Sequence, residues 1–539
     1  MREVSRILSH PIREQGTVLG LPPLLERWAE HLWPVQLEAL AMLFHQPHPL
    51  GIYGDIGVGG GKFLIATLAG AVLGSKRPIV LTKPDLIRQA ESEYDEFKEL
   101  FPEVENHKPT YVAYSTLSQT QSGRLLWQLK PDLIVLDEAH AVASKTSART
   151  RRLVEYVVQN PDTRVCALSG TLNRKRLQDI VHLAEMVLRD TMWLPLRSDI
   201  LRGWSQVLDH GVTPDLQEAK KLLHPLVRWA GVEGGEDIAV YREAYRRRYL
   251  TTPGVIAPTE TSVRCSLVLH QWRVEPSEAI HTSIRTLADE WELPDGTQLV
   301  DALEYWRHGT TLSCGFYYRP IWEGPDIERW QDVRRDWHRA LRTQLQYIRQ
   351  PGLDSPALVE QAGIGGWAHP TTVEAYEAWV DIRDTVVQDS EVVWLDQGLV
   401  KAALMRARAY GRCLLWYESS RAWEPVLRAA GIPVYGAGSE PPTPDVRIAA
   451  LSRHVHGTGK NLQAWDVNLI LEPPSSATPW EQLLGRTHRP GQMSDEVRVD
   501  IMCATWIPRS RIYSAMQEAE YIGKTSNKRH KITFCTWAS

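Results

Sequence analysis

The stretch GDIGVGGGKF, residues 54–63, decides the fold class. An apolar run, LGIY, precedes it, and the apolar stretch LIATLAGAVL follows its phenylalanine. Gly57, Gly59 and Gly61 occupy alternate positions before Lys62. A loop of this kind between a strand and a helix lets backbone N–H groups and the positive end of the helix dipole face a phosphate group. The stretch therefore predicts a nucleotide-binding α/β domain in which Lys62 neutralises the β- and γ-phosphates.

Phe63 departs from the usual pattern of such loops, in which Ser or Thr follows the lysine and binds Mg²⁺. A phenyl ring cannot coordinate a metal ion. One interpretation is that water replaces the missing ligand, because Mg²⁺ keeps several waters in most nucleotide sites. The other is that the ring packs into the core at the start of the helix, while its backbone still shapes the loop. The sequence leaves both interpretations open.

Short apolar runs alternate with helix-like segments over residues 49–170 and again after residue 390. This alternation is typical of parallel sheets covered by helices on both faces. Residues 190–390 contain long charged segments and are expected to be mostly helical, with one strand at 262–274. The expected domains are 1–190, extending as far as about 275, then a helical region at 191–390, a second α/β domain at 391–525 and a basic C-terminal tail at 526–539.

Two carboxylates end the apolar run in LIVLDEAH, residues 133–140. At the tip of a strand, Asp137 is placed to hold Mg²⁺ directly or through water, and Glu138 to orient or deprotonate an attacking water. The structural alternative is an acidic helix N-terminus, stabilised by the helix dipole. An acidic strand tip that follows a glycine–lysine loop in the same α/β domain favours the first interpretation.

The motifs together resemble those of superfamily 2 helicases, and within them the Swi/Snf-like DNA translocases and their phage-encoded DEAH relatives. The most specific match is PWEQLLGRTHRPGQ (479–492), which fits the family pattern Q-x-x-G-R-x-x-R. The matching stretches, in family order, are WPVQLEAL (33–40), GVGGGK (57–62), DEAH (137–140), LSGT (168–171), GTGKNLQAWDVNLILEPP (457–474) and PWEQLLGRTHRPGQ (479–492).

This resemblance implies two RecA-like lobes, with ATP and Mg²⁺ as cofactors and an ATP hydrolase activity. The catalytic residues that it implies are Lys62, Asp137, Glu138, Gln482, Arg486 and Arg489, the two arginines acting as arginine fingers. The ATP-binding residues are Gln36, which would contact adenine, Gly57, Gly59, Gly60, Gly61, Lys62 and Phe63, and the metal ligand is Asp137. The nucleic-acid contacts are Lys83, Ser115, Thr116, Ser419, Gly457, Thr458 and Gly459.

The function implied is an ATP-dependent DNA helicase or translocase that binds DNA largely without sequence preference, with replication or recombination proteins as possible partners. The alternative is a helicase-like module that binds DNA or a partner and hydrolyses ATP weakly or not at all, because of Phe63. The net charge of −4 excludes a globally basic nucleic-acid binder. With no run of about 18 apolar residues and six scattered cysteines, we expect no membrane contact and a cytoplasmic location in a bacterium or phage-infected cell.

Overall fold

The computed structural model forms two compact units. The first unit comprises residues 1–260, 328–384 and 521–528, and the second comprises 261–327, 385–520 and 529–539. The structure describes residues 2–15, 19–145, 147–170, 172, 176–211, 216–232, 237–258, 263, 265–297, 299, 302–348, 350, 353, 356–457, 461–526 and 528–538.

A six-stranded parallel sheet forms the centre of the first unit, with strand order β3-β2-β4-β5-β1-β6. Successive side chains of a strand point to opposite faces, so a strand buried on both faces is apolar at every position. In β4, Ile134 and Leu136 join one core, whereas Leu133 and Val135 join the other. The strands are β1 (Tyr53–Asp55), β2 (Pro78–Thr82), β3 (Thr110–Ala113), β4 (Leu133–Asp137), β5 (Arg164–Ser169) and β6 (Val255–Ile256).

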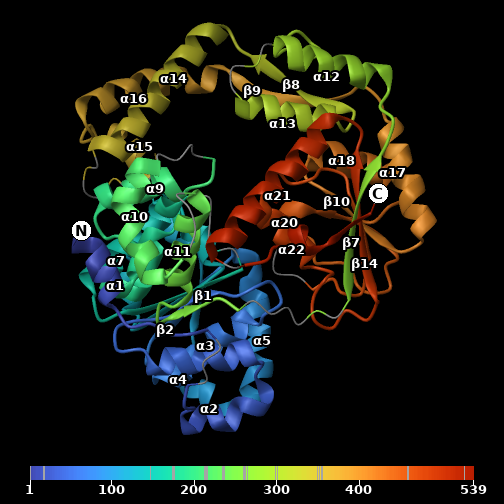
Figure 1. Ribbon diagram of the computed structural model, residues 1–539. Helices are drawn as coiled ribbons and strands as arrows, with labels where there is room; N and C mark the ends of the chain where they lie inside the picture. The colour runs from blue at the N-terminus through green and yellow to red at the C-terminus, as the bar shows by residue number, and fades with distance from the viewer. Residues whose placement is uncertain are drawn as a thin grey trace. The chain divides into compact units, whose positions relative to one another are not determined.

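Helices cover both faces of this sheet (Figure 1). One face packs against α2 (Pro23–Trp28), α3 (Pro34–His45), α4 (Lys62–Leu73) and α5 (Ile87–Leu100). The other packs against α1 (Arg2–Ser9), α6 (Leu125–Leu129), α7 (Ala148–Gln159), α8 (Val181–Leu188), α9 (Ser198–Leu208), α10 (Leu216–Ala230) and α11 (Ile238–Leu250). Since parallel strands end at one edge of the sheet, the loops after β1, β2, β3, β4 and β5 lie together there.

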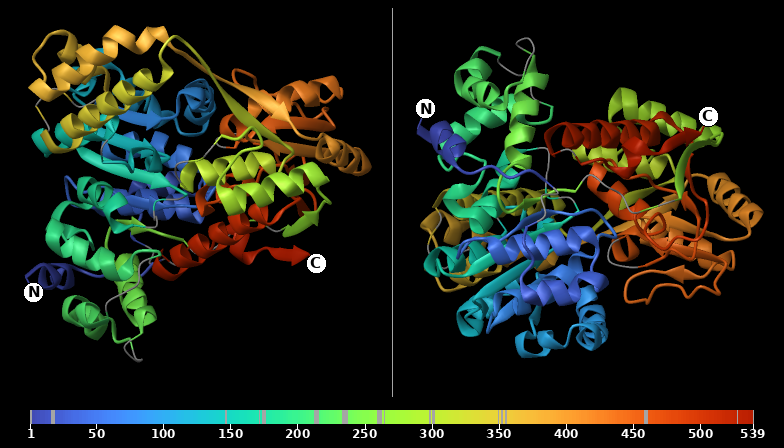
Figure 2. Two further views of the ribbon diagram at one scale, coloured as in Figure 1. Left: turned by 90° about the horizontal axis from the view of Figure 1, so that it is seen from above. Right: turned by 60° about the horizontal axis from the view of Figure 1, so that its bottom comes forward.

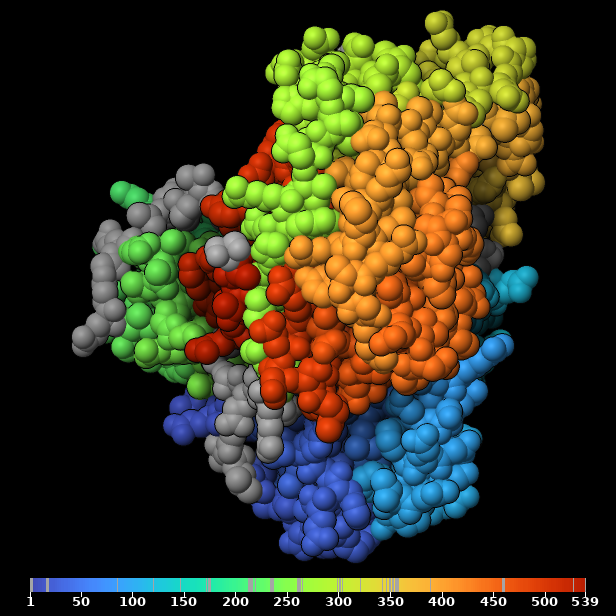
Figure 3. Space-filling model, turned by 90° about the vertical axis from the view of Figure 1, so that its right-hand side faces the viewer, coloured from blue at the N-terminus to red at the C-terminus, as the bar shows by residue number. Residues whose placement is uncertain are grey.

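The second unit contains a seven-stranded parallel sheet with strand order β11-β12-β10-β13-β14-β7-β15. On the surface of the second unit, β7, in yellow-green, lies beside C-terminal residues in red (Figure 3). The strands are β7 (Ser266–Arg273), β10 (Cys413–Tyr417), β11 (Val434–Tyr435), β12 (Ile448–Ser452), β13 (Val467–Ile470), β14 (Glu496–Cys503) and β15 (Thr536–Ala538). The helices are α12 (Glu278–Glu290), α13 (Ala302–Leu312), α17 (Gly398–Tyr410), α18 (Ser420–Ala429), α19 (Arg453–His456), α20 (Ala477–Leu484) and α22 (Lys531–Phe534).

The predicted fold class, two RecA-like parallel-sheet lobes with a mostly helical region between them in sequence, is confirmed by these two sheets. The region between them is helical in α14 (Ile327–Thr343), α15 (Pro356–Ile364) and α16 (Pro370–Ile382), which share a small core of their own. It also holds an antiparallel pair, β8 (Phe316–Glu323) and β9 (Val387–Trp394). Among the described residues no helix combines the length and apolarity needed to cross a membrane.

The structure differs from the expected domain boundaries at two places. The strand expected at 262–274 exists as β7, but it pairs with β14 and β15 in the second sheet, not with the first lobe. The C-terminal residues are not a separate basic tail: α22 and β15 belong to the second unit, and α21 (Trp506–Ser526), one continuous helix in Figure 2, ends in the first. Sequence patterns fix which segments are strands, but partners distant in sequence are chosen by packing.

Candidate nucleotide-binding site

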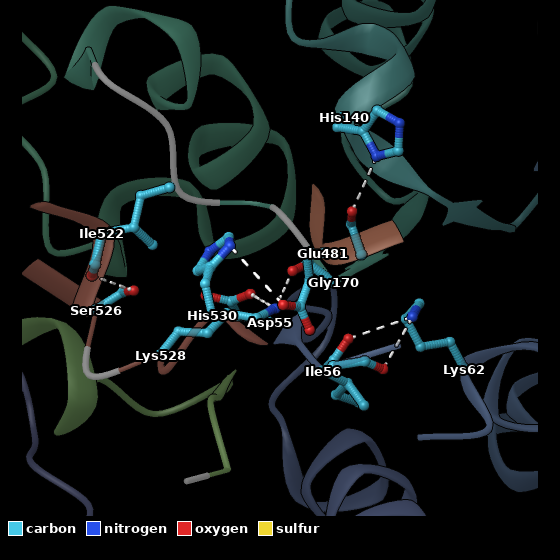
Figure 4. A network of polar contacts seen from close by, with 12 residues as sticks. Asp55, Ile56, Lys62, His140, Gly170, Glu481, Ile522, Ser526, Lys528 and His530 are labelled. Atoms are coloured by element: carbon cyan, nitrogen blue, oxygen red, sulfur yellow. Dashed lines mark hydrogen bonds and ion pairs between the residues drawn. The ribbon is translucent and has the colours of Figure 1, made fainter. Parts of the chain in front are cut away.

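The glycine-rich loop connects β1 to α4 in the first unit. Gly59 and Gly61 have φ angles of 86° and 68°, a left-handed backbone conformation that favours glycine. The ammonium group of Lys62 donates hydrogen bonds to the carbonyl oxygens of Ile56, at 3.3 Å, and Gly57, at 3.2 Å (Figure 4). Lys62 is thus held across the loop by the loop's own backbone, where a phosphate group could replace the carbonyls.

Gln36 contacts this loop from α3. Its Oε1 accepts a hydrogen bond from the backbone N–H of Trp33 at 2.8 Å, which fixes the amide at the start of the helix. A Cβ atom on Gly61 would lie only 1.9 Å from Gln36 Nε2. Gly61 is therefore required both by its φ angle and by the close approach of the glutamine. The structure brings Gln36 to the predicted nucleotide loop.

Asp137 and Glu138 stand at the end of β4, beside the loop. Glu138 Oε1 lies 3.9 Å from Lys62 Nζ. Glu138 has a φ angle of 52°, a conformation that non-glycine residues adopt rarely and that concentrates at functional sites. Three of the predicted catalytic residues, Lys62, Asp137 and Glu138, are thus neighbours in the folded first unit.

The carboxyl group of Asp137 is buried and accepts a hydrogen bond from the neighbouring strand β2. Thr82 Oγ1 donates a hydrogen bond to its Oδ2 at 3.1 Å, and the Tyr114 hydroxyl donates to its backbone oxygen at 2.9 Å. Burial and the neighbouring Glu138 carboxylate raise the pKa of Asp137 to about 6. A buried carboxylate that ionises reluctantly next to a second carboxylate suits a divalent cation, because the ion would supply the missing positive charge. The residues present therefore fit Mg²⁺, with Asp137 as the protein ligand.

Glu138 is held ionised by its surroundings. Burial opposes its charge, but Lys62, His140 and Lys83 together outweigh burial and hold the pKa of Glu138 well below its usual range. Ser169 Oγ donates a hydrogen bond to Glu138 Oε2 at 3.1 Å, and His140 Nδ1 lies 3.2 Å from the same oxygen. The LSGT stretch therefore contacts the DEAH stretch directly.

Thr82, Tyr114, Ser169 and His140 support the two carboxylates and were absent from the predicted catalytic residues. Each lies at or just beyond the end of a strand of the parallel sheet, or just after the acidic pair. Their position after predicted strands could have identified them from the sequence, since ligands bind at the carboxyl ends of parallel strands.

Phe63 packs its ring within the first unit. The ring centroid lies 6.0 Å from that of Phe97 and 5.8 Å from that of Tyr111. Its backbone oxygen accepts a hydrogen bond from Thr67 Oγ1 at 3.0 Å. These contacts favour the second of the two interpretations, in which the ring is a packing residue and the backbone shapes the loop.

The predicted residues Gln482, Arg486 and Arg489 lie together on α20 and the turn after it, in the second unit. Arg486 Nε donates to the Gln482 backbone oxygen at 2.8 Å. Gln482 Nε2 is buried and has no hydrogen-bond partner among the described residues. Buried donors are normally paired, so an oxygen of a ligand would fit at this amide.

The predicted nucleic-acid contacts of the first unit lie at one edge of its sheet. Lys83 follows β2, while Ser115 and Thr116 follow β3, and the ends of these strands pair at Thr82 and Ala113. Ser115 is exposed, and its side chain does not cap the helical turn that follows it. The three residues thus form one polar edge, at which Ser115 is exposed and Lys83 and Thr116 are half-buried.

In the second unit, Ser419 and Gly457 follow the neighbouring strands β10 and β12. The hydroxyl of Ser419 donates to Glu472 Oε1 at 2.7 Å, and its backbone N–H donates to Glu472 Oε2 at 2.8 Å. An internal carboxylate therefore already binds the groups that were expected to contact a nucleic-acid phosphate. Thr458 and Gly459, and Thr171 of LSGT, lie outside the described residues.

No model of a known protein family matches the chain, and no curated protein matches its sequence. Among solved structures, S. cerevisiae Dbp5 bound to RNA and ADP BeF3 aligns with a TM-score of 0.41 and 11% sequence identity, over 98% of this chain and 96% of that chain. A point variant of S. cerevisiae Dbp5, also bound to RNA and ADP BeF3, aligns with the same TM-score and coverage at 10% identity. Similarity of this degree assigns neither an activity nor a ligand to this chain.

Proposed function

We propose that this protein is a nucleic-acid-dependent ATPase of the superfamily 2 helicase type, and that it translocates on DNA. The observation that carries the proposal is the grouping of Lys62, Asp137 and Glu138 around a glycine loop at the carboxyl edge of a parallel sheet. Phosphoryl transfer depends on positioning and charge neutralisation more than on covalent chemistry, and this grouping supplies both.

In the proposed reaction, backbone N–H groups of the loop bind the β- and γ-phosphates, and the Lys62 ammonium group exchanges its two carbonyl partners for phosphate oxygens. Asp137 would hold Mg²⁺, which supplies positive charge to the phosphates when bound. Glu138, ionised and fixed by Ser169, accepts a hydrogen bond from the attacking water and orients it.

The sequence resemblance implies that Gln482, Arg486 and Arg489 also take part in the proposed chemistry. The buried Gln482 amide supports this role because it lacks a partner among the described residues. The arginines would neutralise charge on the phosphoryl group in the transition state.

The proposed nucleic-acid contacts are to the sugar-phosphate backbone, through Lys83, Ser115 and Thr116 of the first unit and Gly457 of the second. Such contacts carry no sequence information, so binding should be largely independent of sequence and sensitive to salt. The resemblance to phage helicases further suggests a cytoplasmic role beside replication or recombination proteins.

The test is ATP hydrolysis measured without nucleic acid and with single-stranded DNA, double-stranded DNA or RNA at matched nucleotide concentration. DNA should stimulate hydrolysis, and the stimulation should fall as salt rises. Displacement of a triplex-forming strand from double-stranded DNA then tests translocation. Stimulation by RNA alone would overturn the DNA proposal and leave the ATPase proposal intact.

The second candidate is a helicase-like binding module with little or no ATPase activity. Phe63 is the observation that favours it, since no side-chain hydroxyl follows the loop lysine. The same titration discriminates between the two: tight DNA binding with no hydrolysis at any Mg²⁺ or Mn²⁺ concentration would support the binding module.

A further inference from the structure

Lys528 lies near the C-terminus of the chain but is buried in the first unit. Its Nζ donates a hydrogen bond to Asp55 Oδ1 at 2.9 Å and another to the backbone oxygen of Gly170 (Figure 4). The side chains of Lys528 and Asp55 are 9% and 0% exposed. A buried ion pair adds little net stability by itself, because both charges lose their hydration. The location of this pair is more informative than its energy.

Both partners of Lys528 adjoin the phosphate loop. Asp55 is the last residue of β1, and the loop begins at the next residue, Ile56. Gly170 packs against the same segment, since a Cβ atom placed on it would lie 3.4 Å from the Ile56 oxygen and 3.4 Å from the Val58 nitrogen. The Ile56 oxygen is one of the two carbonyls that hold Lys62. One ammonium group thus joins the two chain segments that enclose the start of the loop.

Gly170 also connects this contact to the catalytic carboxylate. The preceding residue, Ser169, donates the hydrogen bond to Glu138. Lys528 therefore binds at the point where the loop and the LSGT stretch meet.

The segment that carries Lys528 is anchored at both ends in the first unit. At its start, the Arg242 guanidinium group stacks 5.1 Å from the centre of the Tyr521 ring, and the His210 ring lies 5.4 Å from it. Lys528 forms the other end, and the next residue, Arg529, belongs to the second unit. Residues 521–528 thus belong to the first unit, whereas the residues that precede and follow them in sequence belong to the second.

We infer that Lys528 is a positioning residue for the phosphate loop: by binding Asp55 and Gly170 together it holds the Ile56–Gly57 backbone in the conformation that receives a nucleotide. The inference rests on the proposed nucleotide site for its ligand, but the positioning itself is a property of the nucleotide-free protein.

The experiment compares the wild type with Lys528→Ala, Lys528→Arg and, as a matched control, Lys524→Ala, which changes an exposed lysine of the same segment. Hydrogen exchange of peptides covering residues 54–61 is measured without nucleotide, and binding of a fluorescent ADP analogue is measured with Mg²⁺. Lys528→Ala should speed exchange in this loop and weaken analogue binding about tenfold, raising KM for ATP more than it lowers kcat. Lys528→Arg should recover at least part of the affinity, and Lys524→Ala should match the wild type.

A second variant separates positioning from charge balance, because Lys528→Ala leaves the Asp55 carboxylate buried without its cation. Asp55→Asn combined with Lys528→Met buries no charge and has no ammonium group for Gly170. We expect its melting temperature to recover toward that of the wild type while loop exchange stays fast. Recovery of both stability and slow exchange would overturn the inference, since Lys528 would then only neutralise Asp55. A wild type that binds no nucleotide would refute the proposed function, yet the exchange comparison would still decide whether Lys528 positions the loop.

Discussion

Asp137→Asn should stabilise the nucleotide-free protein while removing its Mg²⁺-dependent activity. Burial and the Glu138 charge raise the pKa of Asp137 from 3.8 to about 6 in the folded protein. Each pKa unit corresponds to about 1.4 kcal/mol, so ionised Asp137 destabilises the fold by about 3 kcal/mol at neutral pH. Asparagine keeps an acceptor for Thr82 but leaves an amide donor to be satisfied, at a cost of about 1 kcal/mol. The net expected gain is about 2 kcal/mol.

The pH dependence gives the sign of this effect. Between the unfolded pKa near 4 and the folded pKa near 6, the folded state binds more protons than the unfolded state. The contribution of Asp137 to wild-type stability therefore falls as pH rises through this window, and its full penalty is present above it. The ionisation penalty that the variant avoids should be largest near pH 8, about half as large near pH 5, and nearly absent below pH 4.

The measurement is the opening free energy of β4 by hydrogen exchange in EDTA, near pH 8 and near pH 5, since this strand reports unfolding of the first unit. Glu138→Gln is the matched control: the pKa of Glu138 is lowered, so the same change from carboxylate to amide should destabilise at pH 8. Adding Mg²⁺ with a non-hydrolysable ATP analogue should stabilise the wild type and not Asp137→Asn. A variant that is less stable than the wild type at pH 8, or a difference that does not change with pH, would refute the reasoning.

Glu138→Gln should nearly abolish DNA-stimulated hydrolysis while leaving ATP binding intact, and steady-state turnover equal to the wild type would remove Glu138 from its proposed role. Arg489→Ala should lower kcat on the order of 10³-fold with little change in ATP or DNA affinity, since an arginine finger acts on transition-state charge; equal losses in binding and turnover would mark a ground-state contact. Phe63→Thr should destabilise the protein by about 2 kcal/mol, because it removes the ring from Phe97 and Tyr111. Urea unfolding and a Mg²⁺ titration of hydrolysis check this together: unchanged stability with a lower Mg²⁺ requirement would show that the ring affects the metal and not the packing.

The sequence predicted best those parts of the candidate site that consist of residues adjacent along the chain. Gly59, Gly61 and Lys62 follow one another along the chain, and the loop that they form needs only a strand before it and a helix after it. The same holds for Asp137 and Glu138 at the tip of an apolar strand. These residues could be selected without coordinates, and the structure brings them to one edge of one sheet.

Other positions could not be assigned from a pattern. Lys528 belongs to a short basic stretch that resembles a solvated tail, yet it is buried against Asp55. Ser419 has the residue type and position of a phosphate contact, but its donors bind Glu472. In both cases the deciding partner is a carboxylate far away in sequence, and nothing near the residue indicates it.

The sequence by itself thus determined the two parallel-sheet lobes, the glycine–lysine loop and the acidic strand tip, because continuous apolar runs and turn chemistry act over a few residues. Only the tertiary structure decided that β7 joins the second sheet, that the Phe63 ring packs on Phe97 and Tyr111, and that Lys528 binds at the base of the loop. The physical reason is that sheet pairing, aromatic packing and buried ion pairs all require groups from distant parts of the sequence. The whole fold brings these groups together, and its favourable energy outweighs the local preference of each segment.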